Sequence, residues 1–219
     1  RLMNIKVILI VLGEPNSTFS EVLLKYFNSN KYKKNKKKII LIGSVKLFEA
    51  QMKILNRKVL LNEISNVNNS ENKKINIINV DYNFKDAFSK IKISSNKYIE
   101  RCFDLSLKII KKKKNCVLIN GPISKKTFLK KKFLGITEYI GYRTKSKNPV
   151  MLIYNEKLAV SPLTTHVPLK KVTQLVKKDK IIKDIIKINK FYKLFFKKKP
   201  NIAVLGLNPH CETTSKVSE

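Results

Sequence analysis

Short apolar runs alternate with longer amphipathic segments along this chain, and this alternation constrains the fold more than any other feature. Four of the runs are rich in isoleucine and valine: residues 6–12, 39–42, 75–80 and 116–120. β-Branched residues favour strands, and short, nearly continuous apolar runs are typical of parallel sheets that are covered on both faces. The pattern therefore predicts an α/β fold with a largely parallel core.

Amphipathic segments between and after these runs are predicted as helices. They cover residues 17–28, 45–55, 96–114 and 170–196, the last with a break near Lys178 and Asp179. Polar residues 62–72 are predicted as a surface loop. Further apolar runs predict strands at residues 150–154, 158–160 and 202–205, the first two as a hairpin around Asn155 and Glu156.

The formal net charge is +32, from 47 lysines and arginines against 15 aspartates and glutamates. Such a charge could serve a nucleic-acid or an anionic membrane partner. Nearly all of it comes from lysine, however, whereas phosphate-reading surfaces favour the bidentate arginine fork. Lysine, asparagine and isoleucine are used heavily throughout, as an AT-rich genome would produce, so we interpret the charge mainly as a composition bias.

Cysteine content and hydropathy predict a cytoplasmic globular protein without a membrane partner. Cys102, Cys116 and Cys211 form no Cys-x-x-Cys pair, and an odd number of cysteines argues against a disulfide framework. No apolar stretch reaches the ~20 residues that a membrane span needs. A chain of 219 residues with 43% hydrophobic content can bury a sizeable core.

Loops after the predicted strands hold the residues that could bind a ligand or take part in a reaction. The two histidines, His166 and His210, follow the runs at 158–160 and 202–205. Ligands of open α/β sheets bind at the carboxyl ends of strands, so the two imidazoles could converge on one metal ion or one substrate. A metal site would need a third ligand, and Glu212 is one candidate. No Gly-rich phosphate-binding motif and no Gly-x-Ser-x-Gly elbow is present.

Five motifs occur in one order along the chain. They are Gly13-Glu14-Pro15, Asn120-Gly121-Pro122-x-x-Lys125, Gly135-x-Thr137-Glu138, Thr164-Thr165-His166-x-Pro168-Leu169 and Gly206-Leu207-Asn208-Pro209-His210. In this combination the chain resembles the 4-hydroxythreonine-4-phosphate dehydrogenase family of pyridoxal phosphate biosynthesis, from about Ile5 to its end. The two histidine motifs are the most specific part of the resemblance.

The resemblance implies a three-layer α/β/α fold like that of isocitrate and isopropylmalate dehydrogenases. Two domains, approximately residues 1–120 and 121–219, would surround a cleft, in a homodimer with the active site near the interface. The implied reaction is NAD- or NADP-dependent oxidation of 4-phosphooxy-L-threonine and decarboxylation to 3-amino-2-oxopropyl phosphate. The implied cofactor besides NAD is a divalent metal, for which neutral imidazoles favour zinc, with magnesium or cobalt as alternatives.

The resemblance also implies roles for individual residues. Three histidines bind the metal in the family; two match His166 and His210, and the third is expected beyond Glu219. Thr137 matches a substrate-contacting threonine. The family usually has histidine where this chain has Ile136, which cannot donate a hydrogen bond. Lys125 could contact the phosphate or carboxylate of the substrate, or could be solvated as one of many lysines.

Two alternatives to an active dehydrogenase stay open. The chain begins with arginine and stops shortly after the second histidine motif, so we expect a fragment that is inactive alone, its C-terminal part missing. Departures from the family pattern after Gly-Glu-Pro and after His210 leave a divergent or inactive relative as one alternative. A basic nucleic-acid-binding α/β protein is the other, and it predicts lysines clustered on one face.

Overall fold

The structure is a computed structural model that describes residues 5–72, 74–113, 115–130, 132–146 and 148–206. Contacts divide the chain into two compact units. The first holds the described residues of Asn4–Pro149 and the second those of Val150–Glu219. Within the described residues no helix is long and apolar enough to cross a membrane. The two domains expected from the family resemblance, approximately residues 1–120 and 121–219, are a separate division of the chain and stay a prediction.

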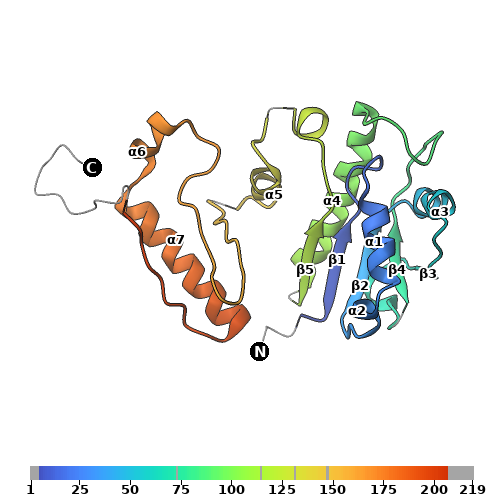
Figure 1. The fold of residues 1–219 in the computed structure, drawn as a ribbon, viewed down its shortest axis with the longest axis horizontal. Helices are drawn as coiled ribbons and strands as arrows, with labels where there is room; N and C mark the ends of the chain where they lie inside the picture. Colours follow the sequence, from blue (N-terminus) through green and yellow to red (C-terminus); the bar gives the residue numbers. More distant parts are fainter. Residues whose placement is uncertain (1–4, 73, 114, 131, 147, 207–219) are drawn as a thin grey trace, which may run out of the picture. The chain divides into compact units, whose positions relative to one another are not determined.

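The first unit contains a five-stranded parallel sheet in the order β3-β4-β2-β1-β5 (Figure 1). Its strands are β1 (Val7–Val11), β2 (Lys38–Gly43), β3 (Leu61–Glu63), β4 (Ile75–Asn79) and β5 (Cys116–Asn120). Val11 pairs with Ile42 on one side and with Asn120 on the other. The central strands therefore end at the same edge of the sheet, and the loops that follow β1 and β5 lie next to each other.

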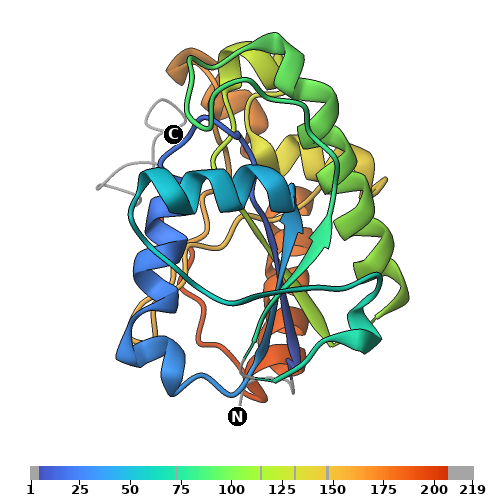
Figure 2. The same cartoon turned by 90° about the vertical axis from the view of Figure 1, so that its right-hand side faces the viewer.

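Helices cover both faces of this sheet. The predicted α/β class with a parallel sheet is thereby confirmed. Successive residues of β1 point to opposite faces: Leu9 packs on one side and Ile10 on the other. The Ile10 face is covered by α1 (Phe19–Phe27) and α3 (Val45–Ile54), and the Leu9 face by α4 (Asn96–Lys112) (Figure 2). Shorter elements complete the unit: α2 (Asn30–Lys33), η1 (Val67–Asn69), η2 (Ile93–Ser95), η3 (Lys125–Leu129) and α5 (Ile136–Arg143).

Four predicted strands and three predicted helices of this unit are confirmed within a few residues. The prediction of a surface loop at 62–72 was wrong at its start, because β3 covers Leu61–Glu63. β3 is short, only half-buried and paired on one side only, with β4. The apolar run that leads into β3 is only three residues long (residues 59–61), so the strand becomes evident only from its pairing with β4.

The second unit consists of consecutive helical segments and of extended segments. η4 (Leu169–Lys171), α6 (Val172–Leu175), α7 (Lys178–Phe191) and η5 (Tyr192–Phe196) follow one another. The break predicted near Lys178 and Asp179 is confirmed within a few residues, because it lies between Leu175 and Lys178. The hairpin at 150–160 is reduced to one antiparallel bridge, Ile153 to Val160. Residues 202–205 form no strand, so that prediction was wrong.

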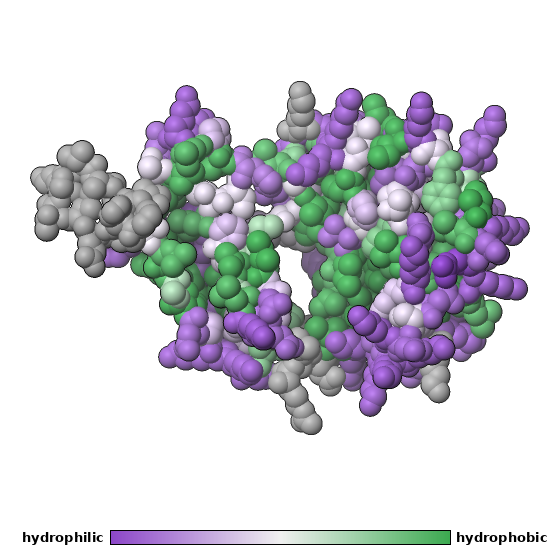
Figure 3. All heavy atoms as spheres, in the orientation of Figure 1, coloured by the Kyte–Doolittle hydropathy of each residue, from purple (hydrophilic) through white to green (hydrophobic). Residues whose placement is uncertain are grey.

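Strand formation needs a hydrogen-bonding neighbour, and the described residues offer none to residues 202–205. Apolar side chains of this unit are correspondingly open to the surface; Leu205 is 87% and Val204 60% exposed. Figure 3 shows such apolar patches on the part of the chain that carries α6 and α7. The histidine motifs therefore follow extended segments, not sheet strands.

Candidate active site

Two glycines lock the loop after β1 against the loop after β5. Gly13 has a φ of +74°, and a Cβ atom there would lie 2.3 Å from the carbonyl oxygen of Pro122. A Cβ atom at Gly121 would lie 2.4 Å from the carbonyl oxygen of Leu12. The backbone N–H of Glu14 donates to Pro122 O at 2.8 Å. Only glycine allows backbones to approach so closely, so the two loops form one rigid unit at the carboxyl edge of the sheet.

Lys125 begins the π-helical turn η3, which directly follows these loops. The hydroxyl of Ser124 accepts a hydrogen bond from Thr127 N at 3.2 Å, and the side-chain amide of Asn96 donates to Thr127 O at 2.9 Å. Phe128 is buried under the turn, whereas Lys125 is exposed. The turn is therefore anchored from the core side, and the ammonium group of Lys125 is available to an anion.

Ile136 and Thr137 form the first turn of α5. Both side chains are half-buried, and Ile136 packs against the apolar core around α4. This position is therefore occupied by apolar packing and not by a hydrogen-bond donor. Thr137 lies beside it at the helix N-terminus, where backbone N–H groups without intrahelical partners favour anionic ligands.

An aromatic cluster connects the Lys125 turn to α5. The ring centroids of Phe128 and Tyr139 lie 5.1 Å apart in an edge-to-face contact. Phe103 of α4, which is fully buried, contacts both rings, at 6.1 Å and 5.5 Å between centroids. Lys125 and Thr137 therefore project from two elements that share one core.

Glu14 is a buried carboxylate at the same edge, and sequence reasoning assigned it no role. Its side chain is only 2% exposed. Burial raises the pKa of the Glu14 carboxyl above its ordinary value of 4.5, and two hydrogen bonds from Asn16 offset part of that rise. The signal in the sequence was a charged residue between Gly13 and Pro15 directly after a buried strand.

We expect Glu14→Gln to change how stability depends on pH. Below the unfolded-state pKa both states hold the proton, so the buried carboxyl costs nothing. As pH rises through the raised folded-state pKa, the folded protein must bury a charge and wild type loses stability relative to the variant. Chemical denaturation between about pH 2 and pH 8, a range that brackets ordinary carboxyl titration, should show this loss and then a plateau.

Glu21→Gln is the matched control for that experiment. Lys25 lies 2.7 Å from Glu21, and this contact lowers the pKa of the Glu21 carboxyl. The stability difference between wild type and this variant should therefore shift in the opposite direction, with wild type losing its advantage as pH falls. If stability changed with pH in the same direction for both variants, burial would not raise the pKa of the Glu14 carboxyl.

His166 lies in the second unit, whereas His210 lies outside the residues that the structure describes. His166 lies in a turn with a φ of +57°, and its side chain is exposed. Residues 158–164 and 200–206, which precede the two histidine motifs, line one cavity of about 710 Å³ together with α7. The segments that lead to the two histidines are thus neighbours, while His210 and Glu212 lie outside the described residues.

No three His, Cys, Asp or Glu side chains lie close enough to hold a metal ion within the described part of the chain. An exposed imidazole on a turn is a suitable metal donor. The described residues therefore supply one donor of the kind expected, but not a complete ligand set.

These features define the class of protein. A parallel sheet is covered by helices on both faces, and the loops that carry Glu14 and Pro122 meet at its carboxyl edge, which is the ligand-binding edge of open α/β proteins. More particularly, the chain belongs to the family described as pyridoxal phosphate biosynthetic protein PdxA, whose family model matches residues 35–217. The resemblance seen in the five motifs is thereby confirmed.

Relatives with curated names agree with this assignment. A 4-hydroxythreonine-4-phosphate dehydrogenase of Sulfurihydrogenibium sp. is 33% identical over 214 residues, which are 95% of this chain and 65% of the relative. The enzyme of the same name from Aquifex aeolicus is 31% identical over 92% of this chain and 62% of its own length. The chain thus spans a little under two thirds of the relatives that it matches.

Solved structures share the fold. The 4-hydroxythreonine-4-phosphate dehydrogenase of Burkholderia phymatum superposes with a TM-score of 0.80 at 20% identity, over 94% of this chain and 64% of that one.

One sequence relative carries a different name. It is a protein of Fusobacterium nucleatum, provisionally named as a D-threonate 4-phosphate dehydrogenase, and it is 25% identical over 93% of this chain and 62% of its own length.

Proposed function

We propose that this chain contributes to a 4-hydroxythreonine-4-phosphate dehydrogenase. The reaction would be NAD- or NADP-dependent oxidation of 4-phosphooxy-L-threonine and its decarboxylation to 3-amino-2-oxopropyl phosphate, in pyridoxal phosphate biosynthesis. The family match over residues 35–217 carries this proposal, because it includes four of the five motifs. The family's homodimer, with two isocitrate dehydrogenase-like domains around a cleft, belongs to the same proposal.

Residues at the carboxyl edge of the sheet would bind the substrate. Lys125 is exposed on an anchored turn, so its ammonium group would meet the phosphate or carboxylate. Thr137 would donate a hydrogen bond from the first turn of α5. Ile136 offers only apolar contact, so it would shape the pocket without binding a polar group.

His166 and His210 would hold a divalent metal, preferably zinc, with magnesium or cobalt as alternatives. The exposed imidazole of His166 and the shared cavity of the two preceding segments support this pairing. The metal would supply Lewis acidity at the substrate's hydroxyl group, and NAD or NADP would supply the hydride acceptor.

The test is substrate-dependent NADH formation by the purified protein in its full natural length. We expect Lys125→Ala to raise the KM for 4-phosphooxy-L-threonine by about 10- to 100-fold, as expected for loss of a charge-assisted hydrogen bond. Lys126→Ala is the matched control: Lys126 is an exposed lysine of the same turn, and its loss should leave KM within about twofold, as for other surface substitutions. Equal effects of the two substitutions would refute the role of Lys125.

Metal content tests the histidines separately from turnover. We expect His166→Ala and His210→Ala each to lower bound zinc by about tenfold or more at limiting metal, because each removes a ligand. Unchanged occupancy in both variants would refute their assignment. A folded, metal-loaded protein without turnover would favour an inactive relative of the family.

Substrate choice is decided by the same assay run with D-threonate 4-phosphate. Ile136, in place of the family's histidine, favours including this second substrate, because the side chain cannot donate a hydrogen bond. Faster turnover of D-threonate 4-phosphate would reassign the substrate and leave the family assignment intact.

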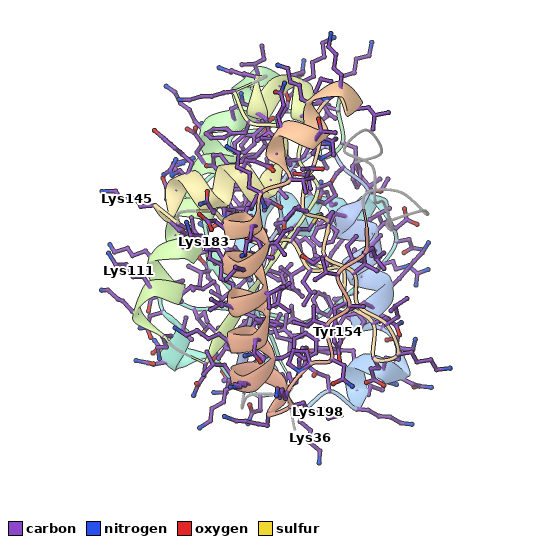
Figure 4. The ribbon with its side chains drawn as sticks, turned by 90° about the vertical axis from the view of Figure 1, so that its left-hand side faces the viewer. Lys36, Lys111, Lys145, Tyr154, Lys183 and Lys198 are labelled. Carbon is purple, nitrogen blue, oxygen red and sulfur yellow. The ribbon has the colours of Figure 1, made fainter. Side chains whose placement is uncertain are left out.

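Three labelled lysines of the first unit do not gather on one face, which counts against the nucleic-acid alternative (Figure 4). In the first unit, Lys111 and Lys145 point to one side, and Lys36 points to another (Figure 4). A nucleic-acid surface would gather them on one face. We therefore expect no sequence-specific or tight nucleic-acid binding at physiological salt.

A further inference from the structure

A small cavity lies beneath the loop that follows β1. Its volume is about 10 Å³, and it is lined by apolar side chains together with the polar residues Glu14, Ser17, Ser20, Gln51 and Tyr98. Ser20 belongs to the first turn of α1 and Gln51 to α3. The cavity therefore lies where the loop, two helices and α4 meet.

Two polar atoms at this cavity have no hydrogen-bond partner among the described residues: Glu14 Oε2 and Ser20 Oγ. Both side chains are nearly inaccessible, at 2% and 6% exposed. The other polar side chains of the cavity have partners. The hydroxyl of Ser17 accepts from Phe19 N at 3.3 Å. The amide of Gln51 donates to Pro15 O at 2.7 Å, and the hydroxyl of Tyr98 accepts from Ser44 N at 3.0 Å.

Burying a carboxylate oxygen and a hydroxyl without partners is costly. A site that offers two polar partners and about 10 Å³ of room matches a single water molecule. A cation would need more oxygen ligands than two. We propose that one ordered water occupies this cavity, donates a hydrogen bond to Glu14 Oε2 and forms a second hydrogen bond with Ser20 Oγ.

This water would couple the loop after β1 to the first turn of α1. Glu14 is already tied through its backbone N–H to Pro122 in the loop before Lys125. The water would thus complete a chain of contacts from α1 to the loop that precedes the Lys125 turn. The inference stands whether or not the proposed reaction is correct, because it uses only the packing of the first unit.

A crystal structure of the protein at a resolution that shows ordered solvent tests the proposal. We expect one peak within hydrogen-bonding distance of both Glu14 Oε2 and Ser20 Oγ. A direct hydrogen bond between these two atoms, or no peak, would overturn it. Crystals soaked in rubidium chloride distinguish a cation: an anomalous peak in the cavity would show a monovalent cation site and also overturn it.

Ser20→Ala provides a second test in solution. The variant removes one partner of the water, so we expect Tm to fall by about 2–4 °C and the water-to-amide magnetisation transfer at Ser20 and its neighbours to be lost. Ser106→Ala is the matched control. Ser106 is also buried, in α4, but its hydroxyl donates to Phe103 O at 2.8 Å within its own helix. Retained magnetisation transfer and Tm in Ser20→Ala would refute the proposal.

Discussion

Gly13→Ala is expected to destabilise the first unit by roughly 2–5 kcal/mol. The left-handed backbone at Gly13 (φ +74°) costs a non-glycine residue about 1–2 kcal/mol. Overpacking costs about 1–3 kcal/mol more, because the new Cβ would lie 2.3 Å from Pro122 O. Relief of that clash would separate the two loops and break the hydrogen bond from Glu14 N to Pro122 O.

Chemical denaturation followed by circular dichroism measures this effect, and Gly141→Ala is the control. Gly141 lies inside α5, where alanine gains about 1 kcal/mol in helix propensity. Its Cβ would lie 3.2 Å from Pro149 Cγ, a contact that a small shift relieves. We therefore expect a change within about 1 kcal/mol. Equal stability of the two variants would show that the loops are not locked at Gly13.

Phe103→Ala is expected to cost about 3–5 kcal/mol, as large-to-small changes of buried aromatic residues do. Phe103 is fully buried and contacts the rings of Phe128 and Tyr139. The cavity would remove the shared support of the Lys125 turn and α5. Tm should therefore fall by roughly 10 °C, and affinity for the phosphorylated substrate should fall with it if the proposed site is correct.

Phe103→Leu distinguishes the loss of buried volume from the loss of the ring contacts that position the Lys125 turn and α5. Leucine fills most of the same space, so we expect a loss of less than about 1.5 kcal/mol. A variant that folds stably but binds substrate poorly would indicate that ring contacts position the two elements. Equal losses for leucine and alanine would contradict the volume argument.

Much of the fold could be predicted because burial leaves a local signature. The apolar runs at β1, β2, β4 and β5 marked their strands, and the amphipathic period marked α4. β3 and residues 202–205 show the limit. β3 has only a three-residue apolar run yet pairs with β4, whereas residues 202–205 have the pattern but no strand neighbour among the described residues. Hydrogen bonding between strands depends on residues that are far away in the sequence.

The candidate site divides in the same way. The order of five motifs was enough to predict the family, because each motif is a short local string. Which side chains meet could not be read from it. Ile136 turned out to pack into the core, and Lys125 and Thr137 turned out to share Phe103 as support. The predicted metal roles of His166 and His210 stay predictions.

The sequence by itself determined the α/β class, the parallel central strands and the family, since these follow from residue periodicity and short motifs. The tertiary structure alone decided that Gly13 and Gly121 interlock and that α5 is tied to the Lys125 turn. It also decided that Glu14 and Ser20, whose hydroxyl has no partner among the described residues, line one buried cavity. The physical reason is the sequence distance over which each feature acts. Periodicity reports how one segment meets the core, whereas these contacts join segments whose approach depends on the packing of the whole unit.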